Sequence, residues 1–419
     1  MALARRKKSR TPFLDRLFDT PETERWALAR EWMRSDPAPF FAELRAEQPI
    51  LVTPDVTLVA RWADVMEILS LPTVFTVDFY KPKMGDFMLA QDETPVNTRD
   101  KGVMHAMLSR DDLPRVRALV AQLAGQALDA ADGRIEIVSQ LSRLTPLRIV
   151  QQYFGLAGAD EEMLRWSYAN QLDQFNNLPF DARADADAVH QAAEDTRGEL
   201  RALLTSLIPA RIQEIKAGQD RDDVLCRVLR TQFPKSVGFG MDRVVINVGG
   251  LLIGAIETTS EAVVNALVEL FRRPSVLAAA QEAALADDPA AFDGFVWEAL
   301  RFTPIVAFMF RKAVSDHVLA RGTPRQTAIA AGTAVLPLSG SAMFDPDWVD
   351  DPDSFKPTRP SQTYLHFGWG HHACLGRYVA SVMVPEIVRQ VLRRPECRPC
   401  GDVDFAGTPF PASYRIEYA

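Results

Sequence analysis

The sequence predicts a mainly α-helical protein, and three observations support that fold class. Apolar residues recur at helical spacing over most of the 419 residues, whereas runs that alternate apolar and polar residues are few and short. No Gly-, Ser- or Pro-rich linker and no internal repeat divides the sequence. Strand and helix patterns do not alternate, which argues against a doubly wound α/β sheet. We therefore expect a single large α-rich domain with small β-sheets.

Helical periodicity justifies the elements in chain order. The predicted helices cover residues 39–46, 64–70, 113–129, 135–152, 161–176, 187–217, 222–230, 242–273, 276–284, 290–302 and 375–394. Alternation predicts short strands over residues 50–60 and 328–338 and near the C-terminus. The longest helix ends before Pro274, because proline lacks the backbone N–H that would continue it.

Composition and charge exclude several classes of protein. The chain has 47 Lys and Arg against 55 Asp and Glu, a net charge of −8, which argues against sequence-independent nucleic-acid binding. No Gly-rich phosphate loop of the Rossmann or P-loop spacing is present. Four cysteines are too few for a disulfide framework and fit a reducing compartment.

Two segments of the sequence bear on where the protein is located: the N-terminus and the most apolar run. Residues 1–20 begin with a basic cluster, and no apolar core follows it as a signal peptide would require. We expect residues 1–20 to form a flexible basic arm and residues 21–419 to form the domain. The longest near-apolar run, residues 244–256, falls short of the ~20 residues of a membrane span. These features predict a cytoplasmic protein with no transmembrane segment.

The segment Phe-Gly-Trp-Gly-His-His-Ala-Cys-Leu-Gly at residues 367–376 carries the most chemical information. The alternate glycines Gly368 and Gly370 permit a tight loop, and Cys374 follows just before a long predicted helix. Amides at a helix N-terminus favour thiolate over thiol. A cysteine held in this way suits either a metal ligand or a nucleophile.

This segment resembles the haem-binding loop of the cytochrome P450 family, the haem-thiolate monooxygenases. The match is Phe-Gly-x-Gly-x-His-x-Cys-x-Gly, position by position. The resemblance implies a single large triangular cytochrome P450-like domain that binds haem b, with Cys374 as the axial ligand of the iron. It also implies that the cofactor contacts Phe367, Gly368, His372 and Gly376. A zinc site is disfavoured, because only one cysteine lies here and structural zinc needs four ligands.

Two further motifs are similar to those of the same family. Glu298 and Arg301 form its Glu-x-x-Arg, and the resemblance adds Arg359 as a third member that stabilises the region under the haem. Taken alone, such a pair is more often a surface ion pair worth about 0.3–0.5 kcal/mol.

The second of these motifs is Gly-Ala-Ile-Glu-Thr-Thr at residues 254–259, in the longest predicted helix. The resemblance assigns proton delivery for O₂ cleavage to Glu257 and Thr258, with Thr259 as backup. The plainer interpretation is a threonine bonded back to the carbonyl four residues earlier and a solvated glutamate.

The sequence departs from the family where the haem propionates are expected to bind. Asn97 and Lys101 stand where bacterial members usually have His and Arg, and Tyr364 stands where His is common. Propionates are anions and need donors. We expect Lys101, Arg311 and His372 as cationic donors, with Asn97 and Tyr364 as neutral ones.

The resemblance also implies an apolar substrate pocket and a redox partner. The expected lining residues are Phe79, Tyr80, Phe87, Phe175, Phe180, Ile253, Gly254, Val306, Phe308 and Phe410. Lys81 and Lys83 could hold a carboxylate, although exposed lysines are more often only solvated. The resemblance implies O₂, an apolar small molecule, and a ferredoxin with an NAD(P)H-dependent reductase that serves a monomer.

Four arginines are candidate contacts for the ferredoxin: Arg110, Arg115, Arg117 and Arg377. Two alternatives stay open for the activity. One is a haem peroxygenase driven by peroxide, and the other is a non-catalytic haem sensor or recruitment module.

Overall fold

The computed structural model describes residues 12–181, 183–219, 221–231 and 233–419. The described chain divides into two compact units. Unit 1 comprises the residues up to Thr76, Val306–Asp353 and Gly368–Gly370; unit 2 comprises Val77–Ile305, Ser354–Phe367 and His371–Ala419. Each unit is assembled from segments far apart in the sequence. The expectation of one domain over residues 21–419 stays a prediction.

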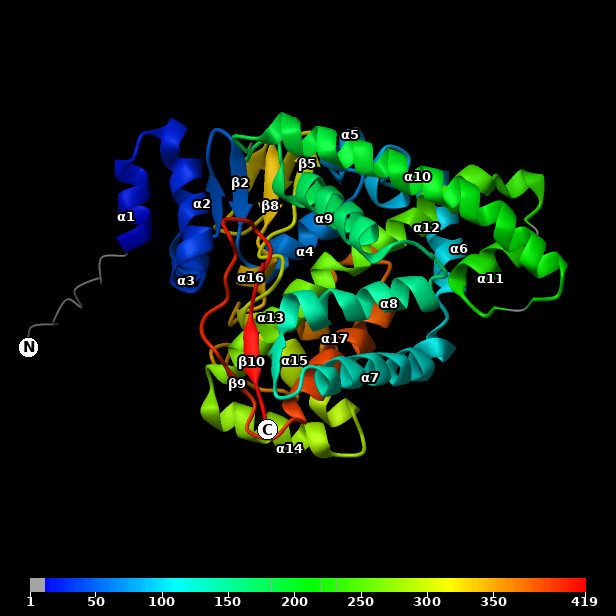
Figure 1. The fold of residues 1–419 in the computed structure, drawn as a ribbon. Helices are drawn as coiled ribbons and strands as arrows, with labels where there is room; N and C mark the ends of the chain where they lie inside the picture. The colour runs from blue at the N-terminus through cyan, green and yellow to red at the C-terminus, as the bar shows by residue number, and fades with distance from the viewer. Residues whose placement is uncertain (1–11, 182, 220, 232) are drawn as a thin grey trace, which may run out of the picture. The chain divides into compact units, whose positions relative to one another are not determined.

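Unit 1 contains a five-stranded sheet with four α-helices before the strand β3 and one after β8 (Figure 1). The strand order is β1 (Ile50–Val52), β2 (Val56–Val59), β8 (Ala334–Pro337), β5 (Arg311–Ala313) and β3 (Phe75–Thr76). Strand β2 runs parallel to β8, and the other neighbours are antiparallel. The helices are α1 (Pro12–Asp19), α2 (Arg25–Ser35), α3 (Pro37–Glu47), α4 (Trp62–Ser70) and α16 (Ser339–Ala342). A separate hairpin pairs β6 (His317–Leu319) with β7 (Thr327–Ile329).

The boundary expected for the N-terminal arm is wrong. Residues Pro12–Asp19 form helix α1, in which Leu14 and Leu17 are buried. The backbone N–H groups of Phe13 and Leu14 donate to the carboxylate of Glu43, at 3.2 and 2.6 Å. Buried apolar side chains and hydrogen bonds from the backbone to a carboxylate hold this segment in a helix. The basic composition of the N-terminus does not indicate either contact. The basic cluster at residues 5–10 lies outside the described residues.

Unit 2 is helical, as the periodicity predicts. Its helices are α5 (Lys81–Met84), α6 (Pro95–Met107), α7 (Leu113–Ala130), α8 (Leu144–Gln152), α9 (Asp160–Asn176), α10 (Ala186–Lys216), α11 (Val224–Arg230), α12 (Met241–Ala255), α13 (Glu257–Phe271), α14 (Pro274–Leu285), α15 (Ala290–Phe302) and α17 (Arg377–Leu392). Its sheet has the order β4 (Arg134–Glu136), β10 (Arg415–Glu417) and β9 (Arg398–Pro399). Helix α13 packs against α15 and α17, and α17 packs against α7 (Figure 1). The mainly α fold with small sheets is confirmed.

Two predicted helices of unit 2 are interrupted. The segment predicted as one helix over residues 135–152 begins as strand β4, passes through a π-helical turn (Val138–Ser142) and becomes α8 only at Leu144. Apolar runs of this length do not distinguish a short buried strand from a helix.

The long helix predicted over residues 242–273 breaks at Ile256, which separates α12 from α13. By length and composition, Met241–Phe271 could cross a membrane, but 67% of its most apolar window is buried inside the protein. Burial of this kind is what the core helix of a folded domain shows.

Candidate functional site

Cys374 lies at the end of a tight loop and just before α17. Gly368 and Gly370 adopt φ values of +67° and +63°, a left-handed conformation that favours glycine. The backbone N–H of Cys374 donates to the carbonyl of Phe367 at 2.8 Å, and the ring of Phe367 packs edge-on against Trp297. Helix α17 begins at Arg377, two residues later than predicted. The sulfur therefore lies beside the helix N-terminus, as the sequence predicts.

The surroundings of Cys374 act on its thiol in opposite directions. Burial raises the pKa of the thiol, whereas the N–H groups of Gly376 and Arg377 and the charges of Lys101 and Arg377 lower it. Cys374 is nevertheless exposed to the surface of the protein chain. At Gly376, an added Cβ would approach only the sulfur of Cys374, at 3.9 Å, among the described residues. This side of the backbone is open to a ligand.

Two of the expected propionate donors are at this loop: His372 lies on it, and Lys101 of α6 contacts it. The ammonium of Lys101 donates to the carbonyl of His371 at 2.5 Å, and burial lowers the pKa of Lys101. The Nε2 atom of His372 lies 3.1 Å from Oδ1 of Asp92, which also accepts the N–H of Val77 at 3.0 Å. These contacts tie α6 and the segment before it to the cysteine loop.

The two neutral donors, Asn97 and Tyr364, have partners within the protein. The side-chain amide of Asn97 is buried and donates to the carbonyls of Met88 and Gln91, at 2.8 and 3.1 Å. The hydroxyl of Tyr364 donates to Glu298 at 3.1 Å. These bonds satisfy both polar groups inside the protein. Their expected role as propionate donors stays a prediction.

Arg311 lies in β5 of unit 1, where it is buried and donates to the carbonyl of Phe310. Its role toward the cofactor stays a prediction. Gly368 also belongs to unit 1. Among the described residues, no group of three or more His, Cys, Asp or Glu side chains could hold a metal ion, so the zinc alternative has no ligand set there.

The predicted trio of Glu298, Arg301 and Arg359 forms one fully connected buried cluster. Arg301 makes two hydrogen bonds to the carboxylate of Glu298, at 3.0 and 2.8 Å, and Arg359 adds a third at 3.0 Å. Neither Glu298 nor Arg301 is exposed at all. Both guanidinium groups also donate to the carbonyl of Ser354. This is the arrangement the resemblance implies, and it is unlike a surface ion pair.

A backbone hydrogen bond and a close helix approach add to the packing around this cluster. The N–H of Lys356 donates to Glu298 at 2.9 Å. Burial alone would raise the pKa of Glu298, but the donors from Arg301, Lys356 and Arg359 hold that pKa below its ordinary value. A Cβ at Gly294 would lie 2.0 Å from the carbonyl oxygen of Pro357, so only glycine lets α15 approach this segment.

An accessible stripe follows one face of α12 and α13, two helices in which most other residues are buried. Gly254 is exposed, and Gly250, Thr258 and Glu261 are half-buried, at successive spacings of four, four and three residues. An added Cβ at Gly254 would meet nothing within 4 Å among the described residues. The hydroxyl of Thr258 donates to the carbonyl of Gly254 at 2.7 Å, which is the back-bonding of the plainer interpretation.

Glu257 and Thr259 lie off that stripe. Both are buried, and Glu257 pairs with Arg143 through an Nη2–Oε1 distance of 2.6 Å. Burial raises the pKa of Glu257, and Arg143 opposes that shift. The interpretation of Glu257 as a solvated glutamate is wrong.

Sequence reasoning missed Glu261. Burial and the charge of Glu257 raise its pKa to about 8, so the carboxyl is largely protonated at neutral pH. Its signal in the sequence was its position, one turn beyond Glu257 and three residues beyond Thr258.

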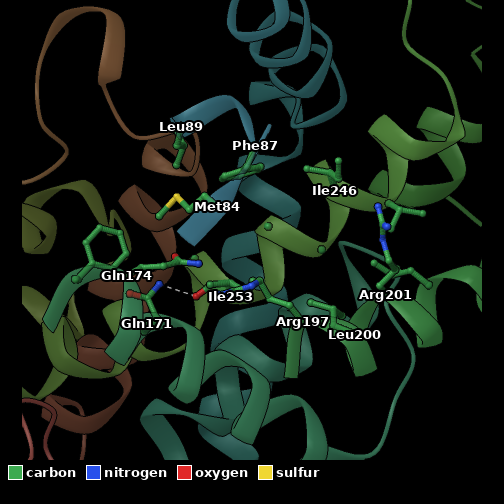
Figure 2. A pocket seen from close by; sticks show the side chains of 16 residues that line it. Met84, Phe87, Leu89, Gln171, Gln174, Arg197, Leu200, Arg201, Ile246 and Ile253 are labelled. Atoms are coloured by element: carbon green, nitrogen blue, oxygen red, sulfur yellow. Dashed lines mark hydrogen bonds between the residues drawn. The ribbon is translucent and has the colours of Figure 1, made fainter. Parts of the chain in front are cut away.

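A cavity of about 200 Å³ opens onto the same face of α12 (Figure 2). Phe87, Phe175, Ile253 and Gly254 line it, as the sequence predicts. The side-chain amide of Gln171 on α9 donates to the carbonyl of Ile253 at 2.7 Å, close to the helix break. The accessible stripe therefore begins at the cavity and continues to Thr258.

The other expected lining residues are placed elsewhere. Phe79 packs on Phe180, Tyr80 on Phe175, and Phe410 on Tyr168, with ring centroids 5.4–5.6 Å apart, and none of Phe79, Tyr80, Phe180 and Phe410 is among the residues that line this cavity. Aromatic rings pack against one another when the fold brings them close. The position of a residue in the sequence does not show which ring it will contact.

Val306 and Phe308 lie in unit 1, and their role in the pocket stays a prediction. The residues missed by sequence reasoning come mainly from α9, α10 and α12: Gln171, Gln174, Arg197, Leu200, Arg201, Leu204, Val245, Ile246 and Gly249.

Comparison with known proteins settles the family. The family model described as Cytochrome P450 matches residues 149–409, which is more than half of the chain. The chain belongs to the cytochrome P450 family. It is a haem-thiolate monooxygenase whose cofactor is haem b.

Its P450 relatives are distant in sequence but share the fold. The chain is 27% identical over 389 residues to the cytochrome P450 monooxygenase PikC of Streptomyces venezuelae, covering 86% of this chain and 84% of that protein. It is 25% identical to a vitamin D(3) 25-hydroxylase of Pseudonocardia autotrophica, covering 86% and 87%. The crystal structure of CalO2 superposes with a TM-score of 0.77 at 23% identity, covering 92% and 97%.

The residues around Cys374 fit haem b. The donor set offers a cysteine sulfur at a helix N-terminus, an open backbone at Gly376, and cations at Lys101 and Arg377. A P450 haem iron takes a cysteine thiolate, and its propionates need donors of this kind.

Proposed function

We propose that this P450 inserts one oxygen atom of O₂ into an apolar small molecule, with electrons from a separate ferredoxin and its NAD(P)H-dependent reductase. One observation supports the proposal above the others. The accessible stripe joins an apolar cavity, at Ile253 and Gly254, to the half-buried hydroxyl of Thr258. A substrate in the cavity and a proton donor for O₂ thus share one accessible stripe, which runs from α12 onto α13.

In this proposal Cys374 would hold the haem iron, and Phe367, Gly368 and Gly376 would contact the cofactor. Lys101, Arg311 and His372 would supply donors for its propionates. Haem b, when bound, supplies the oxygen activation, and the cysteine thiolate favours O–O cleavage. Glu298, Arg301 and Arg359 fix the segments that carry these residues.

The chain's own part of the chemistry is to hold and move protons. The hydroxyl of Thr258 bonds to a carbonyl on the open face and can turn toward O₂ without leaving the helix. Glu257, held by Arg143, is the acid that supplies Thr258, with Thr259 as backup. Burial raises the pKa of Glu257, which favours its protonated form, and Arg143 opposes that shift.

Thr258→Ala tests this assignment, and Thr205→Ala is its matched control, because the exposed hydroxyl of Thr205 on α10 makes the same bond to the carbonyl four residues earlier, at 2.7 Å, outside the cavity lining. Thr258→Ala should release more hydrogen peroxide per NAD(P)H consumed, while Thr205→Ala stays near the parent ratio. Unchanged coupling in Thr258→Ala would overturn the role of that hydroxyl. A haem sensor would show no turnover in any of these proteins.

Electron supply is tested by comparing two donors. Turnover with ferredoxin and reductase should exceed turnover with hydrogen peroxide alone, and the reverse result would favour the peroxygenase alternative. Arg110, Arg115 and Arg377 support a docking surface for an acidic partner; Arg115 pairs with Asp112 and Asp222 but remains half exposed. Arg117 is engaged by Asp293 and Glu386, which removes it from the expected set. We also infer a cytoplasmic monomer; the burial of Met241–Phe271 supports its place inside the protein rather than across a membrane.

A further inference from the structure

We propose that the cavity takes a substrate with an apolar body and an anionic end, and that Arg201 binds that end. This inference rests on the proposed function and names the substrate class of the same site. The lining is mainly apolar, from Met84, Phe87, Leu89, Phe175, Leu200, Leu204, Val245, Ile246 and Ile253. Among the described residues, the charged members of the lining are Arg197 and Arg201, and none of those lining residues is a carboxylate.

The two arginines differ in what they already bind. The guanidinium of Arg197 lies 3.1 Å from Oδ1 of Asn170 and 3.7 Å from Asp173, and it pairs with Glu194. Arg201, one turn further along α10, is exposed, and its side chain makes no hydrogen bond or ion pair with any residue that the structure describes; only its backbone carbonyl accepts a side-chain bond, from Thr205. Arg197 is therefore part of the wall, and Arg201 is available to a ligand.

The charged side chains at and next to the α10 side of the cavity carry a net positive charge. Asp173 is completely buried and is shared by Lys83 at 3.3 Å, His190 at 3.2 Å and Arg197. Lys83, Arg197 and Arg201 thus face only two carboxylates, those of Asp173 and Glu194. The uncompensated charge resides on Arg201, and guanidinium binds carboxylate with two parallel hydrogen bonds. The lysines suggested by the sequence are already engaged, since Lys81 pairs with Asp78.

The position of Arg201 also orients the substrate. Figure 2 shows Arg201 at one end of the cavity and Gln171, bonded to the carbonyl of Ile253, at the other. From Ile246 to Gly254 the helix rises about 12 Å. An anion held at Arg201 would place the far end of an apolar body of that length against Gly254 and Thr258. The carbon that is oxidised should then lie remote from the anionic group.

The test is equilibrium binding of a matched pair, dodecanoate and 1-dodecanol, to the full-length haem protein. Calorimetry and the low- to high-spin change of the resting iron both report binding without turnover. The parent should bind dodecanoate more tightly, and Arg201→Gln should weaken dodecanoate about 10- to 100-fold while leaving dodecanol unchanged. Arg201→Lys should recover part of the loss. Arg165→Gln, at an exposed arginine of α9 outside the cavity, is the control.

Three outcomes would overturn the inference: equal loss of both ligands in Arg201→Gln, no loss of either, or no binding of dodecanoate by the parent. The absorption spectrum of the reduced carbon monoxide complex separates these from failure of the proposed function. If the spectrum is of the thiolate type but Arg201→Gln does not change dodecanoate binding, only the inferred substrate class is contradicted. If the parent lacks that spectrum, the proposed function itself is contradicted.

Discussion

The buried cluster around Glu298 and the accessible stripe around Thr258 both come from sequence motifs of unit 2. The protein supplies bonding partners for every group in the cluster, whereas it leaves part of the stripe open. Each oxygen of Glu298 has donors from the chain, and its guanidinium partners are likewise engaged. On the stripe, Gly254 is open and Thr258 has only a helix carbonyl as partner. A motif that stabilises the fold is closed by protein contacts, whereas a motif that meets ligands is left open.

From this difference we expect the largest loss of stability for the substitution Glu298→Ala. Removing the carboxylate leaves two buried guanidinium groups without a counter-charge, which should lower the free energy of unfolding by about 3–5 kcal/mol. Urea unfolding of the haem protein measures this. Glu22→Ala is the matched control, because Glu22 and Arg25 have the same spacing but form an exposed pair, 3.4 Å apart. It should cost no more than about 1 kcal/mol. Equal costs would remove the distinction between the two kinds of pair.

A smaller effect is expected for Tyr364→Phe. Its hydroxyl donates to the ionised Glu298, so its loss should lower the free energy of unfolding by about 1–3 kcal/mol. Because we assign this hydroxyl to the cluster, haem affinity and the resting absorption spectrum should stay unchanged. A variant that unfolds normally but retains haem poorly would return Tyr364 to the propionates.

Glu261 gives the stripe its own pH dependence. With a pKa of about 8 in the folded protein against an ordinary 4.5, the folded state holds a proton that the unfolded chain releases. Stability contributed by this carboxyl is present at low pH and is lost as pH rises toward 8. Relative to the parent, Glu261→Gln should gain at most about 1.4 kcal/mol per pH unit in that window. Unfolding at pH 5.5 and 8.0 measures it, with exposed Glu282→Gln on α14 as control; parallel curves for parent and Glu261→Gln would contradict the shift.

The smallest effect on stability is expected at Thr258. Thr258→Ala removes one hydrogen bond on an accessible face and should change the free energy of unfolding by no more than about 0.5 kcal/mol. The coupling defect described above should appear without a folding defect. A loss of 2 kcal/mol or more would mean that the hydroxyl serves the fold, and the two motifs would no longer differ in kind.

The same difference explains how far the sequence could predict this molecule. The helices and the Glu298 cluster follow from local periodicity and from a motif whose partners are all in the chain. The α12–α13 break at Ile256, the pairing of Glu257 with Arg143 and the roles of Asn97 and Tyr364 depend on which neighbours the fold brings near. Arg201 carried no motif at all, because a lone arginine on a long helix has the same sequence signal whether it faces solvent or a cavity.

The central claim is that the sulfur of Cys374 binds the haem iron, and one absorption spectrum tests it most directly. The reduced protein with carbon monoxide should show the strongly red-shifted band of a thiolate-ligated haem, and Cys374→Ser should lose that band while folding normally. A histidine-type spectrum in the parent, or a red-shifted band that survives in Cys374→Ser, would contradict the claim.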